Sequence, residues 1–169
     1  MPDEHALELI AQELRESDPE SVLGTVLFRN QATIEVKPAS VRMAIEHLGA
    51  NGYTSLASLH GCDYYPEEPR LGVHYVMLDM RQVDRITIKT RVTIAEPTLA
   101  SVVDMFPGAD FPEREVYDMF GVVFDGHPDL RRILMPEDYE GFPQRRDFPV
   151  GGEPVLFTYN EVQSYGKFQ

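Results

Sequence analysis

The chain has 169 residues, 43% of them hydrophobic and 25% charged, with a formal net charge of −13 at pH 7. This composition is that of an ordinary soluble globular protein, and the length fits one domain with a short appendage. The negative charge argues against a nucleic-acid-binding surface and against adsorption to an anionic membrane, because both need clustered Lys and Arg.

The first part of the chain combines helical and strand patterns. Residues 3–16 carry apolar side chains at the spacing of an amphipathic helix, namely Leu7, Ile10, Ala11 and Leu14. Residues 22–28 and 32–36 flank a short polar turn and predict a hairpin of two strands. Pro38 suits the first turn of a second helix, where its missing amide hydrogen is not needed, and Gly49 or Gly52 is available to end that helix.

Three strands and a helix are predicted next. Residues 54–65 and 72–80 are predicted strands, and the second is apolar on both faces, as a central strand is. Residues 86–94 alternate apolar and polar side chains, which predicts a strand with one buried face. A short helix is predicted after Thr98, a suitable N-cap, from Leu99, Val102, Val103 and Phe106. Residues 1–106 are thus expected to form an α+β domain with helices packed on one mainly antiparallel sheet.

Residues 107–169 have a different character. Seven of the 13 prolines fall between Pro107 and Pro154, so little regular structure is expected after a short helix at 112–120. Apolar side chains nevertheless recur, at Leu130, Ile133, Leu134, Met135, Tyr139, Phe142 and Phe148. An extended chain of this kind needs a surface on which to bury them and to satisfy its backbone. We therefore expect residues 107–169 to form the short helix and an extended, proline-rich arm that docks on a partner protein.

The charged residues of segment 110–121 are explained by helix formation. Asp110 is a plausible N-cap, Glu113 has the spacing of a capping box, and Gly121 is a suitable stop. The alternative is that Glu113 and Glu115 work as a catalytic acid and base. On a helix, side chains two positions apart point about 200° apart, so they do not converge on one cleft.

The segment that begins in this helix carries a family resemblance. Residues 113–149 read EREVYDMFGVVFDGHPDLRRILMPEDYEGFPQRRDFP. They closely resemble the most recognisable segment of the 30-kilodalton subunit of NADH-quinone oxidoreductase, or respiratory complex I. The matching elements are Glu113-Arg114-Glu115, Tyr117-Asp118-Met119-Phe120-Gly121, Gly126-His127-Pro128, Leu130-Arg131-Arg132-Ile133-Leu134 and Pro136-Glu137-Asp138.

The departures from the family pattern are mild. Tyr139 stands where the family usually has Trp, which could alter a local packing contact. Gln144-Arg145-Arg146-Asp147 stands where Leu-Arg-Lys-Asp is common. A weaker resemblance, in the order of the predicted elements, extends over essentially the whole chain.

The resemblance implies a non-catalytic subunit of the peripheral arm of complex I. Such a subunit lies beside the 49-kilodalton subunit and scaffolds the quinone module, while neighbouring subunits hold FMN, the iron–sulfur clusters and quinone. No cofactor is then expected in this chain. The residues agree, because a lone Cys62 cannot supply the four thiolates of a cluster and no glycine-rich dinucleotide motif follows a strand.

The resemblance also implies a place on the cytoplasmic side of the inner membrane, with attachment only through partner subunits. The sequence contains no run of about 18 apolar residues that could span a bilayer. Its first residues lack the basic and apolar stretches of a signal peptide. A single cysteine indicates a reducing compartment.

The residues expected to contact partners belong to the family motif and the arm. They are Glu113, Arg114, Glu115, Asp118, His127, Arg131, Arg132, Pro136, Arg145, Arg146, Asp147 and Phe148. Arginines beside aromatic anchors suit bidentate binding of carboxylates on another subunit. The alternative is that these arginines neutralise local acids, at Asp129, Glu137, Asp138 and Asp147. On the docking hypothesis, truncation after Gly121 leaves a folded domain that no longer assembles.

A metal site competes with this prediction. His60 and Cys62 face the same way on a predicted strand, and His74 lies on the next one. A zinc site needs three or four ligands with supporting groups, and no other residues have ligand spacing, so no metal is expected.

Two alternative functions remain open. A stand-alone acid–base hydrolase or binding domain would use Glu113, Glu115 and His127, although Gly126 and Pro128 explain the segment around His127 as a turn. The other alternative is a homologous subunit of a membrane-bound hydrogenase or a related complex.

Overall fold

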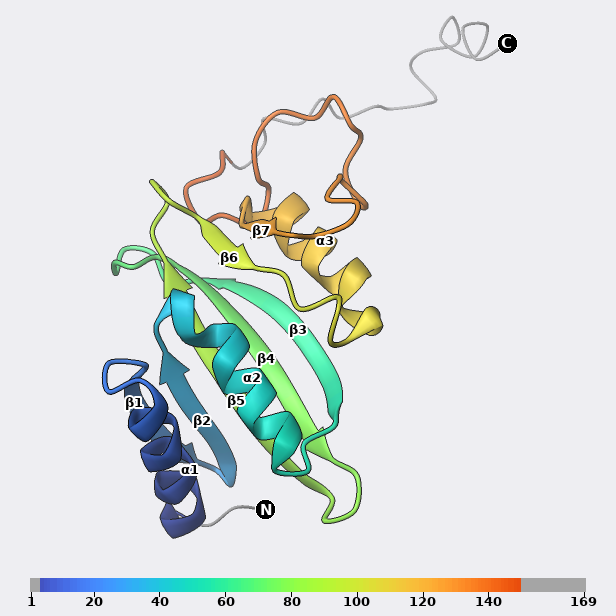
Figure 1. Cartoon of the computed structure of the whole chain (residues 1–169). Helices are drawn as coiled ribbons and strands as arrows, with labels where there is room; N and C mark the ends of the chain where they lie inside the picture. Colours follow the sequence, from blue (N-terminus) through green and yellow to red (C-terminus); the bar gives the residue numbers. More distant parts are fainter. Residues whose placement is uncertain (1–3, 150–169) are drawn as a thin grey trace, which may run out of the picture.

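The computed structural model of the chain describes residues 4–149. Figure 1 shows its elements, which are α1 (Glu4–Ser17), β1 (Val22–Phe28), β2 (Gln31–Val36), α2 (Val41–Ala50), β3 (Ser55–Asp63), β4 (Leu71–Asp79), β5 (Asp84–Val92), β6 (Thr98–Ala100), α3 (Asp110–Phe120) and β7 (Val123–Asp125). Short 3-10 turns at Pro38–Ser40 and Pro107–Ala109 precede α2 and α3. The last part of the predicted arm, 150–169, lies outside the described residues.

Five strands form a mixed sheet in the order β1-β2-β5-β4-β3. β1 and β2 form the predicted antiparallel hairpin, and its turn residues Arg29 and Asn30 both have positive φ, as tight hairpin turns favour. β2 runs parallel to β5, whereas β4 pairs antiparallel with both β3 and β5. The predicted α+β fold on a mainly antiparallel sheet is therefore confirmed.

The core lies between this sheet and the helices on one of its faces. Helices α1 and α2 cover that face in Figure 1. Their buried side chains belong to the predicted apolar stripes: Leu7, Ala11, Leu14, Val41, Ala44, Ile45 and Leu48. On β5, buried Ile86 and Ile88 alternate with half-buried Thr87 and Lys89, as the sequence predicts. Because each side of the sheet receives every second residue, the other face carries the polar set.

Helix α3 packs against β3, at the edge of the sheet. The ring of Phe120 lies so close to Gly61 that a Cβ atom at that position would approach it to 2.5 Å. The C-terminal end of α3, after which the arm begins, is therefore attached to the sheet by direct packing.

Residues 98–106 do not form the predicted helix. Thr98–Ala100 instead form β6, which pairs in parallel with β7. The amide of Ser101 donates to the carbonyl of Asp125 at 2.8 Å, and the amide of Val123 donates to the carbonyl of Pro97 at 2.7 Å. The helical spacing of the apolar residues was misleading, because a distant segment supplies backbone partners that local periodicity cannot register.

The pairing of β6 with β7 spans the predicted division between residues 106 and 107. Val122 and Phe124, which follow the end of α3, are buried in the core. Truncation after Gly121 would remove these side chains and expose the surface they cover. We therefore expect the truncated chain to lose stability, contrary to the expectation from sequence that it would fold as before.

The predicted capping box of α3 is also wrong. Asp110 is the first helical residue, Ala109 is the N-cap, and no side chain caps the helix. The carboxylate of Glu113 is bound elsewhere, as described below. The predicted stop is confirmed, because Gly121 is left-handed with φ of 77° and its amide donates to the carbonyl of Tyr117 at 2.9 Å.

Candidate partner-binding site

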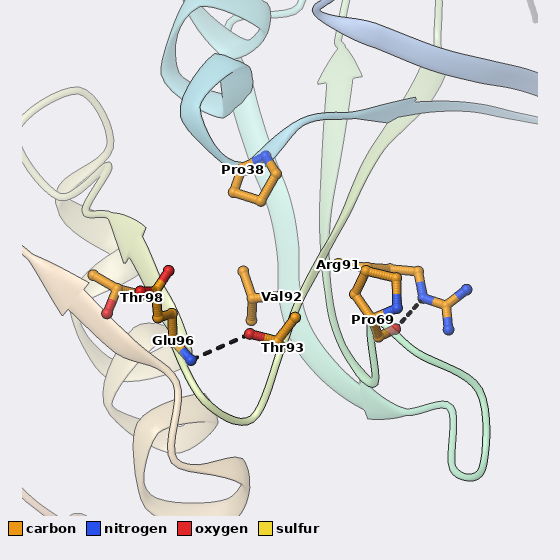
Figure 2. Close-up of a pocket in the computed structure, with 7 residues that line it drawn as sticks. All are labelled: Pro38, Pro69, Arg91, Val92, Thr93, Glu96 and Thr98. Carbon is orange, nitrogen blue, oxygen red and sulfur yellow. Dashed lines mark hydrogen bonds between the residues drawn. The ribbon is translucent and has the colours of Figure 1, made fainter.

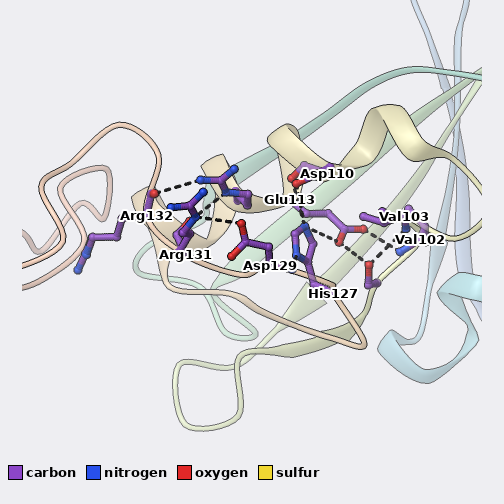
Figure 3. A network of polar contacts seen from close by, with 10 residues as sticks. Val102, Val103, Asp110, Glu113, His127, Asp129, Arg131 and Arg132 are labelled. Atoms are coloured by element: carbon purple, nitrogen blue, oxygen red, sulfur yellow. Dashed lines mark hydrogen bonds and ion pairs between the residues drawn. The ribbon is translucent and has the colours of Figure 1, made fainter.

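The carboxylate of Glu113 ties α3 to the segment after β6 (Figure 3). It is 0% exposed, and it accepts hydrogen bonds from the Ser101 hydroxyl at 2.7 Å and the Val102 amide at 2.8 Å. His127 Nε2 lies 3.9 Å from Glu113 Oε2 and 3.5 Å from Asp110 Oδ1. Burial raises the pKa of Glu113, and the hydrogen bonds from Val102 and Ser101 oppose this rise.

This network does not form an acid–base catalytic site. The side chains of Glu113 and His127 have no exposed surface, so a substrate cannot reach them. Glu115 lies on the exposed side of α3, as the helical angle predicts. General acid–base catalysis needs a group within hydrogen-bond reach of a bound substrate, and this arrangement provides none.

A cavity of about 360 Å³ lies near the ends of β5 and β6 (Figure 2). Its lining includes Glu96 and Arg91 but neither Glu113 nor His127. Arg91 Nε donates to the Pro69 carbonyl at 2.6 Å, and the Glu96 amide donates to the Thr93 hydroxyl at 3.2 Å. The cavity therefore brings no pair of carboxylates together.

Asp118 of α3 binds the arm, and we call this contact the first clasp. Its buried Oδ2 accepts hydrogen bonds from the amides of Ile133, Leu134 and Met135, at 3.1, 2.8 and 2.8 Å. Its Oδ1 accepts a hydrogen bond from Arg132 Nη1 at 2.6 Å. Burial alone would raise the pKa of Asp118, but these hydrogen bonds together hold it below the ordinary value.

Arg114 supports the same stretch of the arm. Its Nε and Nη2 donate to the carbonyls of Arg131 and Arg132, at 3.2 and 3.3 Å. Its guanidinium carbon lies 5.7 Å from the centroid of the Phe111 ring. Although Arg114 and Asp118 are helix neighbours, within residues 4–149 no ion pair joins them, because each is used to hold the arm.

A second clasp holds the arm at residues 146 and 147. The side chains of Arg70 and Asp63 are almost fully buried and form a bidentate pair, with distances of 2.7 and 2.6 Å. Arg70 also binds both carboxylate oxygens of Asp147, at 2.8 and 2.6 Å, and the amide of Arg146 donates to Asp63 at 2.7 Å. The hydrogen bond from Arg70 is the main reason why the pKa of Asp63 is held well below its ordinary value.

Between the clasps, the arm packs on the end of α3. Arg145 Nε donates to the carbonyl of Phe120 at 2.6 Å, and its guanidinium carbon lies 4.4 Å from the centroid of the Phe142 ring. A Cβ atom at Gly121 would come within 2.6 Å of both Arg145 and Phe142. This close approach gives Gly121 a second role besides ending the helix.

The predicted partner-binding residues thus divide into two groups. Glu113, Arg114 and Asp118 are buried, as is the side chain of His127. Arg132, Arg145 and Asp147 bind groups of their own chain. Glu115, Arg131, Pro136 and Arg146 are exposed, and Phe148 is half-buried. Arg131 fits the alternative that the arginines neutralise nearby acids, because it pairs with Asp129 at 2.9 Å. Contact of these residues with a partner stays a prediction.

Among the side chains that the clasps leave exposed, four form what we call the arm patch: Phe111, Arg131, Ile133 and Leu134. Its apolar members include Phe111, 61% exposed, and Leu134, 60% exposed. Arg114 connects the two parts of the patch, because it contacts both the Phe111 ring and the backbone at Arg131. Arg70 and Asp63, which help to hold the arm, were not recognised from sequence, because their partners lie 77 and 83 residues away.

The predicted neighbours His60 and His74 do face the same side of the sheet. Their rings stack with centroids 5.1 Å apart, and His74 Nε2 lies 2.9 Å from the hydroxyl of Tyr64. Among the residues that the structure describes, no three His, Cys, Asp or Glu side chains are arranged to hold a metal ion. Within 4–149, none of the helices has the length and apolar character needed to cross a bilayer.

Comparisons with known proteins agree with the motif. A sequence model of the family described as "Respiratory-chain NADH dehydrogenase, 30 Kd subunit" matches residues 34–154. An NADH-quinone oxidoreductase subunit of Roseiflexus sp. (strain RS-1) is 38% identical over 159 residues, which cover 92% of this chain and 91% of the relative. The equivalent subunit of Roseiflexus castenholzii (strain DSM 13941 / HLO8) is 41% identical over 150 residues, which cover 87% and 86%.

Solved structures share the fold. One described as "Nqo5 of the trypsin-resistant fragment (1-134) in P63 form" has a TM-score of 0.65 at 29% identity and covers 73% of this chain and 98% of its own. A chain of the membrane-bound sulfane sulfur reductase, an archaeal respiratory membrane complex, has a TM-score of 0.69 at 21% identity, with coverage of 91% and 88%. The family match over most of the chain and the similarity to the two Roseiflexus subunits show that this chain belongs to the family of the 30-kilodalton subunit of respiratory-chain NADH dehydrogenase.

Proposed function

We propose that this chain is a non-catalytic subunit of the peripheral arm of NADH-quinone oxidoreductase. It binds the 49-kilodalton subunit and scaffolds the quinone module, while FMN, the iron–sulfur clusters, quinone and proton translocation belong to neighbouring subunits. The names of its relatives support membership of such a complex. On this proposal the chain lies on the cytoplasmic side of the inner membrane and is attached only through its partners.

The observation that carries the proposal is the way the chain uses its buried charged side chains. Glu113, Asp118 and Arg70 are buried, and their hydrogen bonds fix segments of the chain to one another. The exposed fractions of these side chains are 0% for Glu113, 0% for Asp118 and 5% for Arg70, which supports a structural role for them. Their hydrogen bonds hold the arm in a fixed position on the domain.

A rigid arm suits docking, because side chains that are already ordered lose less conformational entropy on binding. The arm patch combines exposed apolar side chains with an arginine, and such residues are enriched at the centres of protein interfaces. The 49-kilodalton subunit is the proposed occupant of this patch.

The test is co-purification of the 49-kilodalton subunit with a tagged chain that carries Leu134→Asp. Leu134 is 60% exposed, so the substitution should leave the fold intact, as circular dichroism can verify, but place a charge in the interface. The control is Met80→Asp, because Met80 is 67% exposed and lies in the turn between β4 and β5. We expect the first variant to lose the 49-kilodalton subunit and the control to retain it. Equal retention by both folded variants would contradict the proposed docking surface.

A further inference from the structure

The face of the sheet opposite α1 and α2 contains a hollow of about 400 Å³. Its lining residues are Gln31, Ala32, Thr33, His60, His74, Val76, Arg85 and Thr87. The strand register places these side chains together, because Thr87 lies between Thr33 and Val76, and His74 lies beside His60. The hollow therefore belongs to the middle of the sheet and is built on rigid strands.

The charge of the hollow is opposite to that of the protein. The chain has a net charge of −13, yet the lining contains an arginine and two histidines and no carboxylate. Among residues 4–149, no carboxylate forms an ion pair with the Arg85 side chain. The nearby acid Glu35 is already paired with Lys89 at 3.2 Å. An unpaired guanidinium among hydroxyl and imidazole groups favours a carboxylate ligand.

The histidine pair forms a fixed wall of the hollow. The two rings are almost parallel, with an angle of 5° between them. One nitrogen of each ring is already bonded, since His60 Nδ1 lies 3.2 Å from the Ser58 hydroxyl and His74 Nε2 lies 2.9 Å from the Tyr64 hydroxyl. Within the described chain, the remaining nitrogens have no hydrogen-bond partner, so each ring keeps one position for a ligand.

Tyr64 covers the neighbouring part of the same face. Its ring lies 4.9 Å from the ammonium of Lys89 and 4.4 Å from the guanidinium carbon of Arg91. Burial, followed by the charges of His60 and Lys89, lowers the pKa of His74 to about 4. The ring is therefore neutral at pH 7. Among residues 4–149, Lys89 and Arg91 on the same face are held by contacts within the chain, whereas no carboxylate pairs with the guanidinium of Arg85, which lines the hollow.

An apolar rim lies beside the hollow on edge strand β1. Phe28 and Val26 are 63% and 55% exposed, and they pair with Gln31 and Thr33 of the lining. A small free anion would contact only the polar residues that line the hollow. An anionic side chain with an apolar neighbour would use both parts of the surface, and edge strand β1 also offers backbone groups to an extended chain.

We propose that this face of the sheet binds an acidic segment of a partner polypeptide. A carboxylate of the segment occupies the hollow against Arg85 and the histidine pair, and an adjacent apolar side chain packs on Val26 and Phe28. The charge of the hollow selects an acidic partner, since complementary charges favour association. None of the arm-patch residues lines the hollow, so this is a second docking surface.

The test has two steps, and the first uses the complex isolated through a tag on this chain. A photo-crosslinking benzoylphenylalanine replaces Phe28, and the same residue replaces Met80 as the control. We expect a specific cross-link from position 28, to a segment that contains Asp or Glu. A cross-link to a segment without an acidic residue, or no cross-link above the level of the control, would overturn the proposal.

The second step measures binding of the captured segment, as a synthetic peptide, to the purified chain. We expect Arg85→Glu to weaken binding at least about tenfold, whereas Arg81→Glu, the same change in the exposed β4–β5 turn, has little effect. Replacing the acid of the peptide by its amide should weaken binding similarly. Equal effects of the two substitutions, or a peptide that binds no more tightly than inorganic phosphate, would also overturn the proposal. The result does not depend on the arm patch or on the 49-kilodalton subunit.

Discussion

The carboxylate of Asp118 attaches the arm to α3. It accepts hydrogen bonds from three consecutive amides, those of residues 133–135, and from Arg132. The substitution Asp118→Ala removes all four acceptor contacts at once. It also leaves the guanidinium of Arg132, whose side chain is 14% exposed, without its carboxylate.

The size of the effect follows from burial. Breaking a buried, hydrogen-bonded ion pair by removing one partner costs about 3–5 kcal/mol. Residues 133 and 134 are exposed, so water replaces part of the lost hydrogen bonding, and we expect the lower end of this range. A loss of about 3 kcal/mol corresponds to roughly a 100-fold increase in the equilibrium constant for opening of the arm.

Hydrogen exchange at pH 7 measures this opening directly. We expect the amides of residues 133–135 to exchange about 100-fold faster in Asp118→Ala than in the wild type, while amides of β4 and β5 keep their protection. Glu115→Ala is the matched control, because Glu115 lies on the same helix and is exposed. Unchanged exchange at residues 133–135, or an equal increase in the control, would refute the reasoning.

Three further substitutions test other contacts. Because the folded-state pKa of Asp63 is lowered, its ion pair with Arg70 stabilises the protein above about pH 4, and this stabilisation is lost as the pH falls. In urea titrations, Arg70→Ala should lower the free energy of unfolding at pH 7 by about 3–5 kcal/mol and reduce its dependence on acid pH. The raised pKa of Glu113 has the opposite effect, so the free energy of unfolding falls as the pH rises above about 4. Glu113→Gln should reduce this fall, and an unchanged dependence of the free energy of unfolding on pH between pH 4 and 7 would contradict the reasoning. Gly121→Ala places a Cβ at positive φ within 2.6 Å of Phe142 and should lower the melting temperature by about 3 °C or more, whereas Gly108→Ala, where a Cβ meets no atom within 4 Å, should change it little.

Some features could be predicted because they depend on neighbours in the sequence. The buried stripe of α1 repeats with the period of a helix, and β5 alternates with the period of a strand. The stop at Gly121 follows from the one residue type that adopts a left-handed conformation at no steric cost. The motif over residues 113–149 identified the family for a similar reason, since residue types and their spacing can be read from the sequence without coordinates.

The predictions that the structure contradicts depend on contacts between residues that are distant in the sequence. The spacing of the apolar residues predicts a helix after Thr98, but residues 98–100 form a strand whose partner, β7, lies about 25 positions further along the chain. Glu113 was assigned to a cap because the Ser101 hydroxyl and the Val102 amide were not known to lie beside it. In both cases the prediction assumed a partner close in the sequence, whereas the structure provides a distant one.

The sequence by itself determined the α+β class, most of the elements and the membership of the family, because these depend on residue type and short-range periodicity. Only the tertiary structure decided which charged side chains are paired within the molecule and which remain available at its surface. Arg70 binds Asp147, which lies 77 positions away, whereas the guanidinium of Arg85 forms no ion pair with a carboxylate among residues 4–149. The physical reason is that the energy of a charge depends on its surroundings in space, which the order of residues does not specify.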